Sequence, residues 1–189
     1  MKTRLRAVAL AAVLAAPGLP AQGQAVNPHA QALQEFRERV DEYVKLRDKV
    51  RAEMPKLEET SDPAEITSRE HALGVAIRAA RSAARQGEIF RPEVARIFRE
   101  TIRSNFSRRS PKERQAALDA LPGNLALKIN DSYPPTVPLA TVPPTLLRQL
   151  PPLPDTLEYR LVGNRLILRD VNANLVVDFI TNVVSKPPA

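Results

Sequence analysis

Few residues of this 189-residue chain have side chains suited to acid–base or metal chemistry. It has two histidines, His29 and His71, and it has no cysteine. Without cysteine there is no disulfide, no thiolate metal site and no cysteine nucleophile. No motif links either histidine to a serine and an aspartate, so we expect His71 to be an ordinary helix residue. The sequence predicts no catalytic residue, no metal ligand and no cofactor, and we expect the protein not to be an enzyme.

One segment has the spacing of ligands for a metal ion. Residues 170–174 read DVNAN, which matches the first ligands of a calcium-binding loop. Leu175 stands where such a loop needs glycine, and Thr181 stands where it needs a bidentate glutamate. We interpret the segment as a turn rich in aspartate and asparagine. A metal-stress or hydrolytic role is the least favoured alternative, and His71 beside a carboxylate in a cleft would revive it.

Arginine spacing is the pattern that could bind a ligand. In two segments an arginine recurs every three or four residues, so each set would lie along one face of a helix. The two sets are Arg78, Arg81, Arg85 and Arg96, Arg99, Arg103. Residues 69–114 hold twelve basic and five acidic side chains, whereas residues 30–62 hold seven basic and nine acidic ones. Two hypotheses stay open: these arginines are solvated or pair with the acidic first helix, or they bind anionic envelope polymers or lipids.

Residues 1–25 are predicted to be a secretory signal peptide, because three cations precede an apolar run from Ala7 to Ala16 and then helix breakers. The run is about half the length that a membrane-spanning helix needs, so no span is expected after cleavage behind Gly23 or Ala25. Loss of the three cations lowers the formal net charge from +7 to +4 (7 − 3). We expect a periplasmic or secreted protein without a nucleic-acid partner.

Residues 26–123 have the apolar spacing of about four amphipathic helices. In the first, apolar residues fall on a seven-residue grid that only Arg47 breaks. Caps followed by proline, such as Asp62-Pro63 and Ser110-Pro111, predict helix starts, and the second helix should reach Arg85. Short polar connections favour an antiparallel bundle.

Residues 124–155 are rich in both proline and aliphatic residues. The prolines exclude a long helix and favour extended chain. The aliphatic residues predict a strap that packs across the helices, with a short turn of helix at residues 145–149. A semi-rigid linker is the alternative.

Residues 156–184 predict a three-stranded antiparallel meander, and residues 185–189 a disordered tail. The Gly163-Asn164 turn sets Tyr159 opposite Leu168 and Glu158 opposite Arg169. Three strands are not stable alone, so one face must dock on the helices or the strap. A one-residue shift would bring Asp178 onto that face. The expected docking face consists of Tyr159, Leu161, Leu166, Leu168, Val177 and Phe179. The expected pairing sets Leu161 opposite Leu166, Leu168 opposite Val177, Leu166 opposite Phe179 and Asp170 opposite Leu175, so that Asp170 is the one polar residue on the apolar face.

The same segment contains YRLVG at residues 159–163, LILRD at residues 166–170 and VVD at residues 176–178. After a proline-rich lead-in, this order resembles the C-terminal β element of small exported bacterial proteins of largely unknown function. Periplasmic nickel/cobalt-homeostasis accessory proteins are among them. The resemblance implies a β element over roughly 30 residues and assigns no functional residue.

Together these features predict an α+β fold, mainly α: a helical bundle, a proline-rich strap and a C-terminal meander. The leading hypothesis is a non-catalytic exported protein of the cell envelope that binds a protein partner or self-associates. Binding of an anionic envelope polymer or lipid through the arginines is the alternative.

Overall fold

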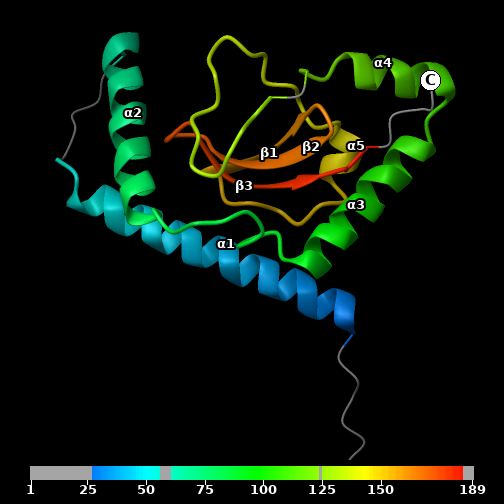
Figure 1. The fold of residues 1–189 in the computed structure, drawn as a ribbon, viewed down its shortest axis with the longest axis horizontal. Coiled ribbons are helices and arrows are strands. Elements are labelled where there is room, and N and C mark those ends of the chain that lie inside the picture. The colour runs from blue at the N-terminus through cyan, green and yellow to red at the C-terminus, as the bar shows by residue number, and fades with distance from the viewer. Residues whose placement is uncertain (1–26, 56–60, 124, 185–189) are drawn as a thin grey trace, which may run out of the picture.

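The computed structural model describes residues 27–55, 61–123 and 125–184. The signal peptide predicted for residues 1–25 and the tail at 185–189 lie outside these residues. The described chain has an α+β fold, mainly α, which confirms the predicted class (Figure 1). Its elements are α1 (Pro28–Glu53), α2 (Pro63–Ala80), α3 (Pro92–Ser107), α4 (Pro111–Asp119), α5 (Pro144–Leu147), β1 (Leu157–Val162), β2 (Arg165–Asp170) and β3 (Leu175–Thr181).

Each helix has a proline in its first turn, where the missing N–H costs no hydrogen bond. Asp62 caps α2, and Ser110 forms a capping box with Glu113 at the start of α4. Among the described residues, no helix combines the length and hydropathy that crossing a bilayer requires.

The end of α2 differs from the prediction. The helix stops at Ala80 rather than at Arg85. The carbonyl of Arg81 accepts a hydrogen bond from the Asn130 side chain, and the Arg85 N–H donates to the Glu88 carboxylate. Because these partners replace the next helical hydrogen bond, the chain leaves the helix and turns toward the sheet.

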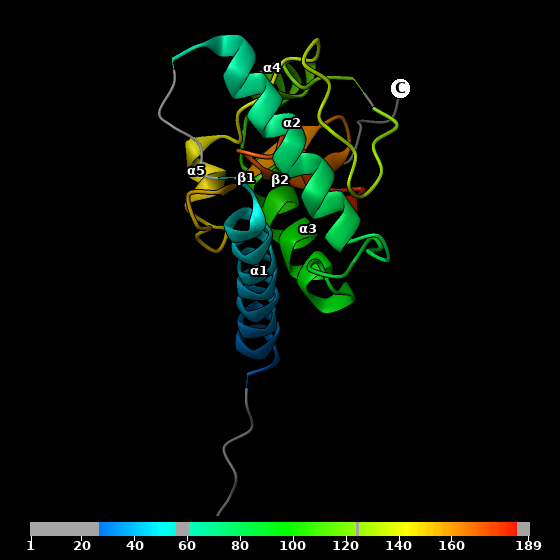
Figure 2. The same cartoon turned by 90° about the vertical axis from the view of Figure 1, so that its left-hand side faces the viewer.

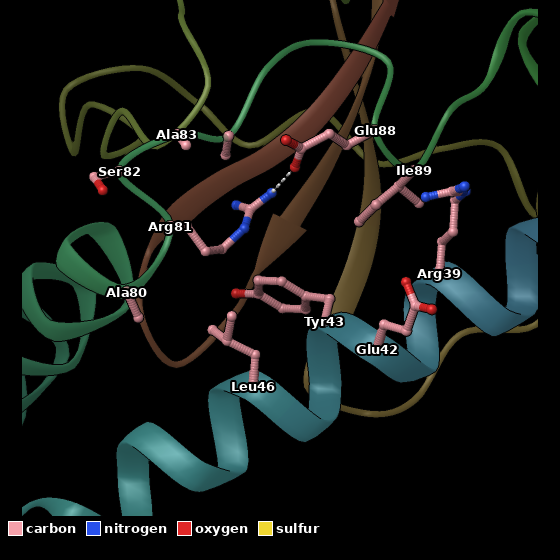
Figure 3. Close-up of a pocket in the computed structure, with 11 residues that line it drawn as sticks. Arg39, Glu42, Tyr43, Leu46, Ala80, Arg81, Ser82, Ala83, Glu88 and Ile89 are labelled. Carbon is pink, nitrogen blue, oxygen red and sulfur yellow. Dashed lines mark hydrogen bonds and ion pairs between the residues drawn. The ribbon is translucent and has the colours of Figure 1, made fainter.

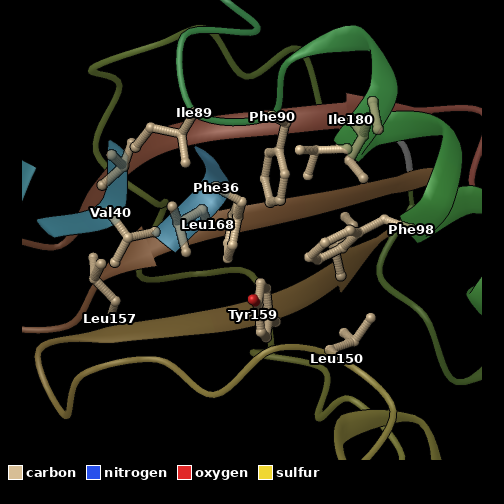
Figure 4. Close-up of a cluster of buried hydrophobic side chains, with 14 of the residues drawn as sticks. Phe36, Val40, Ile89, Phe90, Phe98, Leu150, Leu157, Tyr159, Leu168 and Ile180 are labelled. Carbon is tan, nitrogen blue, oxygen red and sulfur yellow. The ribbon is translucent and has the colours of Figure 1, made fainter. Parts of the chain in front are cut away.

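One hydrophobic core joins the helices to the sheet. Phe36 of α1, Phe90, Phe98 of α3 and Tyr159 of β1 form a chain of ring contacts with centroids 5.3–5.8 Å apart. Figure 4 shows these rings between the helices and the strands. The apolar residues on the seven-residue grid of α1, which we call the heptad stripe, therefore pack on the sheet, within the same core as α2 and α3.

The three strands form an antiparallel sheet in the order β1-β2-β3. The β1–β2 register is the predicted one, with Tyr159 opposite Leu168 and Glu158 opposite Arg169. Between β2 and β3 the register shifts, so that Leu168 lies opposite Asp178 and not Val177. The predicted pairing of Asp170 with Leu175 is correct. From Leu168 onward the predicted pairing is wrong, and Leu166 pairs with Ile180 instead of Phe179. The reason is an irregularity in β3 that is typical of a β-bulge.

The register shift changes which residues face the helices. Tyr159, Leu161, Leu166, Leu168 and Val177 belong to the helix-side cluster as expected. Phe179 does not: it lies on the opposite face, in a second cluster. One extra residue in a strand inverts the alternation of its side chains, so the prediction for Phe179 is wrong and Asp178 turns inward instead.

The proline-rich strap has two parts with different partners. Leu127 and Tyr133 cover the sheet face opposite the helices, where they meet Ile167 and Phe179. Val142, Leu146 and Leu150 join the helix-side core, with α5 packed near α3. The first part therefore covers the sheet, not the helices as predicted.

Candidate functional site

A groove of about 470 Å³, lined by both charged and apolar residues, lies between α1 and the turn that follows α2. Figure 3 shows Arg39, Glu42 and Tyr43 on the α1 side, with Arg81 and Glu88 opposite. Two arginines and two glutamates balance each other in charge. Neither histidine lines this groove, since His71 is exposed on α2 and His29 is exposed at the start of α1.

Arg81 is the buried cation of this groove, and the fold already uses its donors. Its Nη1 donates to the Asn130 side chain at 2.8 Å, and its Nη2 donates to the Val177 carbonyl at 3.2 Å. The guanidinium also lies 5.1 Å from the centre of the Tyr43 ring and pairs with Glu88 at 3.4 Å. Arg81 thus joins the end of α2 to the strap and to β3.

Next to this groove, α1 and β2 share a buried ion pair. The Arg47 side chain is 1% exposed and its Nε donates to Oδ2 of Asp170 at 2.8 Å. The Tyr43 hydroxyl donates to the same oxygen at 2.8 Å, and the Ala173 N–H donates to Oδ1 at 2.9 Å. Burial, with the adjacent Asp170 charge and hydrogen bond, raises the pKa of Tyr43 far above its ordinary value. Tyr43 therefore remains a neutral donor and is not available as a base.

This ion pair is what the sequence reasoning missed. Arg47 was the single residue that broke the apolar grid of α1, and Asp170 was the acidic residue that the predicted pairing left on the apolar face. A buried charge is tolerated when it has a partner of opposite sign. The apolar stripe of α1 and the apolar face of the sheet must pack together, and each contains one charged residue, of opposite sign. This was the signal that could have predicted the pair.

Asp178 forms a second buried polar centre. Its carboxylate accepts hydrogen bonds from the main-chain N–H groups of Gly87, Ile89, Phe90 and Phe179, at 2.8–2.9 Å. Burial raises the pKa of Asp178 above its ordinary value, and the four N–H donors oppose that rise. Gly87 has φ +85°, which lets the loop bend around the carboxylate. Asp178 thus fixes the 87–90 loop to β3.

Four of the six predicted anion-binding arginines hold the fold together. Arg78 donates to the Asn130 carbonyl at 2.9 Å, Arg99 to the Thr181 carbonyl at 2.8 Å and Arg103 to the Asn182 carbonyl at 2.6 Å. Arg81 acts in the same way, as described above. The other two are exposed: Arg96 pairs with acidic neighbours on α3, and Arg85 lies beyond the end of α2.

Several of these donors cover the outer edge of β3. Arg81 and Arg99 bond the carbonyls of Val177 and Thr181, and Gln86 bonds the carbonyl of Phe179 between them. An open strand edge is a template for pairing with another chain. Side chains from the α2–α3 region therefore close this edge, which argues against partner binding by strand addition at β3.

The turn at residues 170–174 is also used internally. The Asp170 carboxylate accepts a hydrogen bond from Arg47 of α1. The side-chain oxygen of Asn174 accepts two hydrogen bonds from Arg169, at 2.8 and 3.0 Å. In residues 27–55, 61–123 and 125–184, no group of three or more His, Cys, Asp or Glu side chains is placed to hold a metal ion.

A second groove, which we call the strap groove, is mainly apolar and has a volume of about 550 Å³. It lies between the second part of the strap and β1. Its apolar lining includes Val142, Leu147, Leu150, Leu153, Leu157 and Tyr159. Arg148, Glu158 and Arg160 line it as well. The Tyr159 hydroxyl donates to the Pro151 carbonyl at 3.0 Å, so it adds no free polar group.

Comparison with protein-family models, curated proteins and solved structures found no match to this chain. The resemblance of residues 157–180 to the β element of small exported proteins stays a prediction. Conclusions about function therefore rest on the geometry of the chain itself.

Proposed function

We propose that this chain is an exported, non-catalytic protein of the bacterial cell envelope that acts by binding a protein partner or a second copy of itself. The observation that carries the proposal is the use of its buried ionisable groups. Arg47, Asp170, Arg81 and Asp178 each connect one structural element to another. A catalytic acid or base needs contact with a bound substrate, whereas these groups make their hydrogen bonds to other residues of the chain.

The heptad stripe of α1 does not provide the interaction surface. Phe36, Val40 and Tyr43 are buried in the helix-side core, so they cannot also pack against a helix from another chain. Self-association, if it uses a helix, requires a different one.

The α2 helix offers the surface that best supports the proposal. Its buried residues are Leu73, Gly74 and Ile77, all in its second half. Figures 1 and 2 show its N-terminal end standing away from α1. Ile66 and Val75 are 42% and 46% exposed. Helices in proteins are stabilised mainly by packing, so a helix with this much unpacked surface is suited to contact with a partner.

The test compares two exposed aliphatic residues. Val75→Asp places a charge on α2, and Leu139→Asp places one on the strap, where the native side chain is 40% exposed. Sedimentation of the purified chain over a range of concentrations measures self-association, and crosslinking in cells measures capture of envelope proteins. We expect Val75→Asp to abolish the association or capture that Leu139→Asp leaves intact. A monomer that captures no envelope protein, or equal effects of the two variants, would contradict the proposal.

Binding of anionic polymers through the six arginines stays a prediction, and the contacts of Arg78, Arg81, Arg99 and Arg103 give it no support. A hydrolytic or metal-stress role also stays a prediction. Its one candidate residue, His71, is exposed and does not line either groove described above, so the geometry gives this role no support.

A further inference from the structure

The strap groove has the features of a site for a small apolar ligand. Such sites have volumes of roughly 300–1,000 Å³, apolar walls and a few polar groups that orient the ligand. This groove measures about 550 Å³, and buried Val142, Leu150, Leu157 and Tyr159 contribute to its lining. Leu147, which is 49% exposed, also lines it and leaves apolar surface in contact with water.

The polar part of the lining carries two arginines with unused donors. Arg148 is exposed, and within the described chain its side chain has no hydrogen bond or ion pair to another residue. Arg160 pairs with Glu158 through Nη2, its side chain is 20% exposed, and among the described residues its Nη1 has no hydrogen-bond partner. Glu158 also pairs with Arg169, whose Nη1 lies 2.7 Å from Oε1 of Glu158. One carboxylate thus pairs with two cations, and the groove has spare donors for an anion.

The hydrogen bonds of Glu158 keep it in the anionic form. Burial alone would raise the pKa of Glu158, but hydrogen bonds from Arg160 and Arg169 outweigh burial and hold it below its ordinary value. Because Glu158 stays charged and engaged, a ligand anion would contact Arg148 and the Nη1 of Arg160.

We propose that the strap groove binds a free fatty acid: its single acyl chain lies along the apolar lining and its carboxylate pairs with Arg148 and Arg160. The apolar walls suit the acyl chain, and the two arginines with unused donors suit the negative head. The size of the groove favours one chain over the two chains of a phospholipid. This site is separate from the α2 surface, so it stands or fails independently of the proposed partner binding.

The test is displacement of a fluorescent fatty acid, 11-(dansylamino)undecanoic acid, from the purified chain by palmitate. We expect one site, with Arg148→Gln and Arg160→Gln each weakening palmitate about tenfold or more. Arg108→Gln is the matched control, because Arg108 is an exposed arginine outside the groove, and it should leave affinity unchanged. Hexadecanol, which has the same chain without the charge, should displace the probe at least tenfold less well.

Leu153→Trp, which fills the groove without changing charge, should abolish binding, with circular dichroism reporting whether the variant folds. Arg148→Gln alters an exposed side chain and keeps the test decisive if the tryptophan variant does not fold. Equal displacement by palmitate and hexadecanol would overturn the proposal, as would equal affinity of Arg148→Gln and Arg108→Gln. Displacement by phosphatidylglycerol vesicles but not by palmitate would also overturn it.

Discussion

The two faces of the sheet are held by different kinds of contact. On the helix face, two buried carboxylates, Asp170 and Asp178, are fixed by directional hydrogen bonds from α1 and from the 87–90 loop. On the strap face, Ile167 and Phe179 meet the aliphatic and aromatic residues of the strap. Hydrophobic contact is non-directional, whereas a buried charge demands one particular partner. The helix face should therefore define the register of the sheet, and the strap face should add stability.

The largest effect should come from removing the cation of the buried pair. Arg47→Ala leaves Asp170 buried without its ionic partner, and we expect the free energy of unfolding to fall by about 3–5 kcal/mol. Urea denaturation followed by circular dichroism measures the change. A loss within about 0.5 kcal/mol, as for an ordinary surface substitution, would contradict the proposed role.

The matched control for Arg47→Ala replaces both partners. Arg47→Met combined with Asp170→Asn removes both charges and keeps a polar side chain beside the Tyr43 hydroxyl and the Ala173 N–H, so it should recover most of the lost stability. If the double variant is as unstable as Arg47→Ala, the cost arises from lost packing and not from an unpaired charge.

The second effect concerns Asp178. Asp178→Ala leaves the N–H groups of Gly87, Ile89 and Phe90 without their acceptor, and the expected loss is about 3 kcal/mol. Asp155→Ala, at an exposed aspartate in the strap, should change stability little. Equal denaturation midpoints for the two variants would show that the contacts of Asp178 do not fix the loop.

The third effect is a pH dependence of the same carboxyl group. Because the pKa of Asp178 is raised above 3.8 by burial, its contribution to stability is greatest below pH 3.8 and falls as pH rises through the raised pKa. The advantage of the native protein over Asp178→Asn should shrink over that window by about 1.4 kcal/mol for each unit of the rise in pKa. Urea midpoints measured between pH 3.5 and pH 7 test this, and an advantage that grows with pH would refute it.

The smallest effect belongs to the strap face. Ile167→Val removes one methyl group from the second cluster, and the expected loss is about 1 kcal/mol. Amide exchange in α1 should keep its native pattern, because the helix-face contacts remain. A larger change in α1 than in the strap would mean that the two faces are not distinct in the way described.

The sequence predicted those features that depend on local signals. The β1–β2 register followed from one turn, Gly163-Asn164, and from regular alternation on either side of it. The caps at Asp62 and Ser110 marked helix starts because each acts within a few residues. The α+β class followed from the same local patterns.

The features that were missed depend on residues far apart in the chain. The bulge in β3 turns Asp178 toward a loop about ninety positions earlier, and no pattern within the strand announces that partner. The end of α2 depends on Asn130 in the strap, so its own sequence suggested a longer helix. For the strap groove, the apolar residues were visible in the sequence, but their meeting with Arg160 required the fold.

Hydrogen exchange of the native protein, measured by mass spectrometry across α1 and the sheet, tests the central claim most directly. That claim is that the helices and the sheet are one cooperative unit joined by buried charges. It predicts that core amides of α1, β2 and β3 open with the same free energy and that Arg47→Ala lowers all of them equally. Exchange of the strands while α1 stays protected would contradict it.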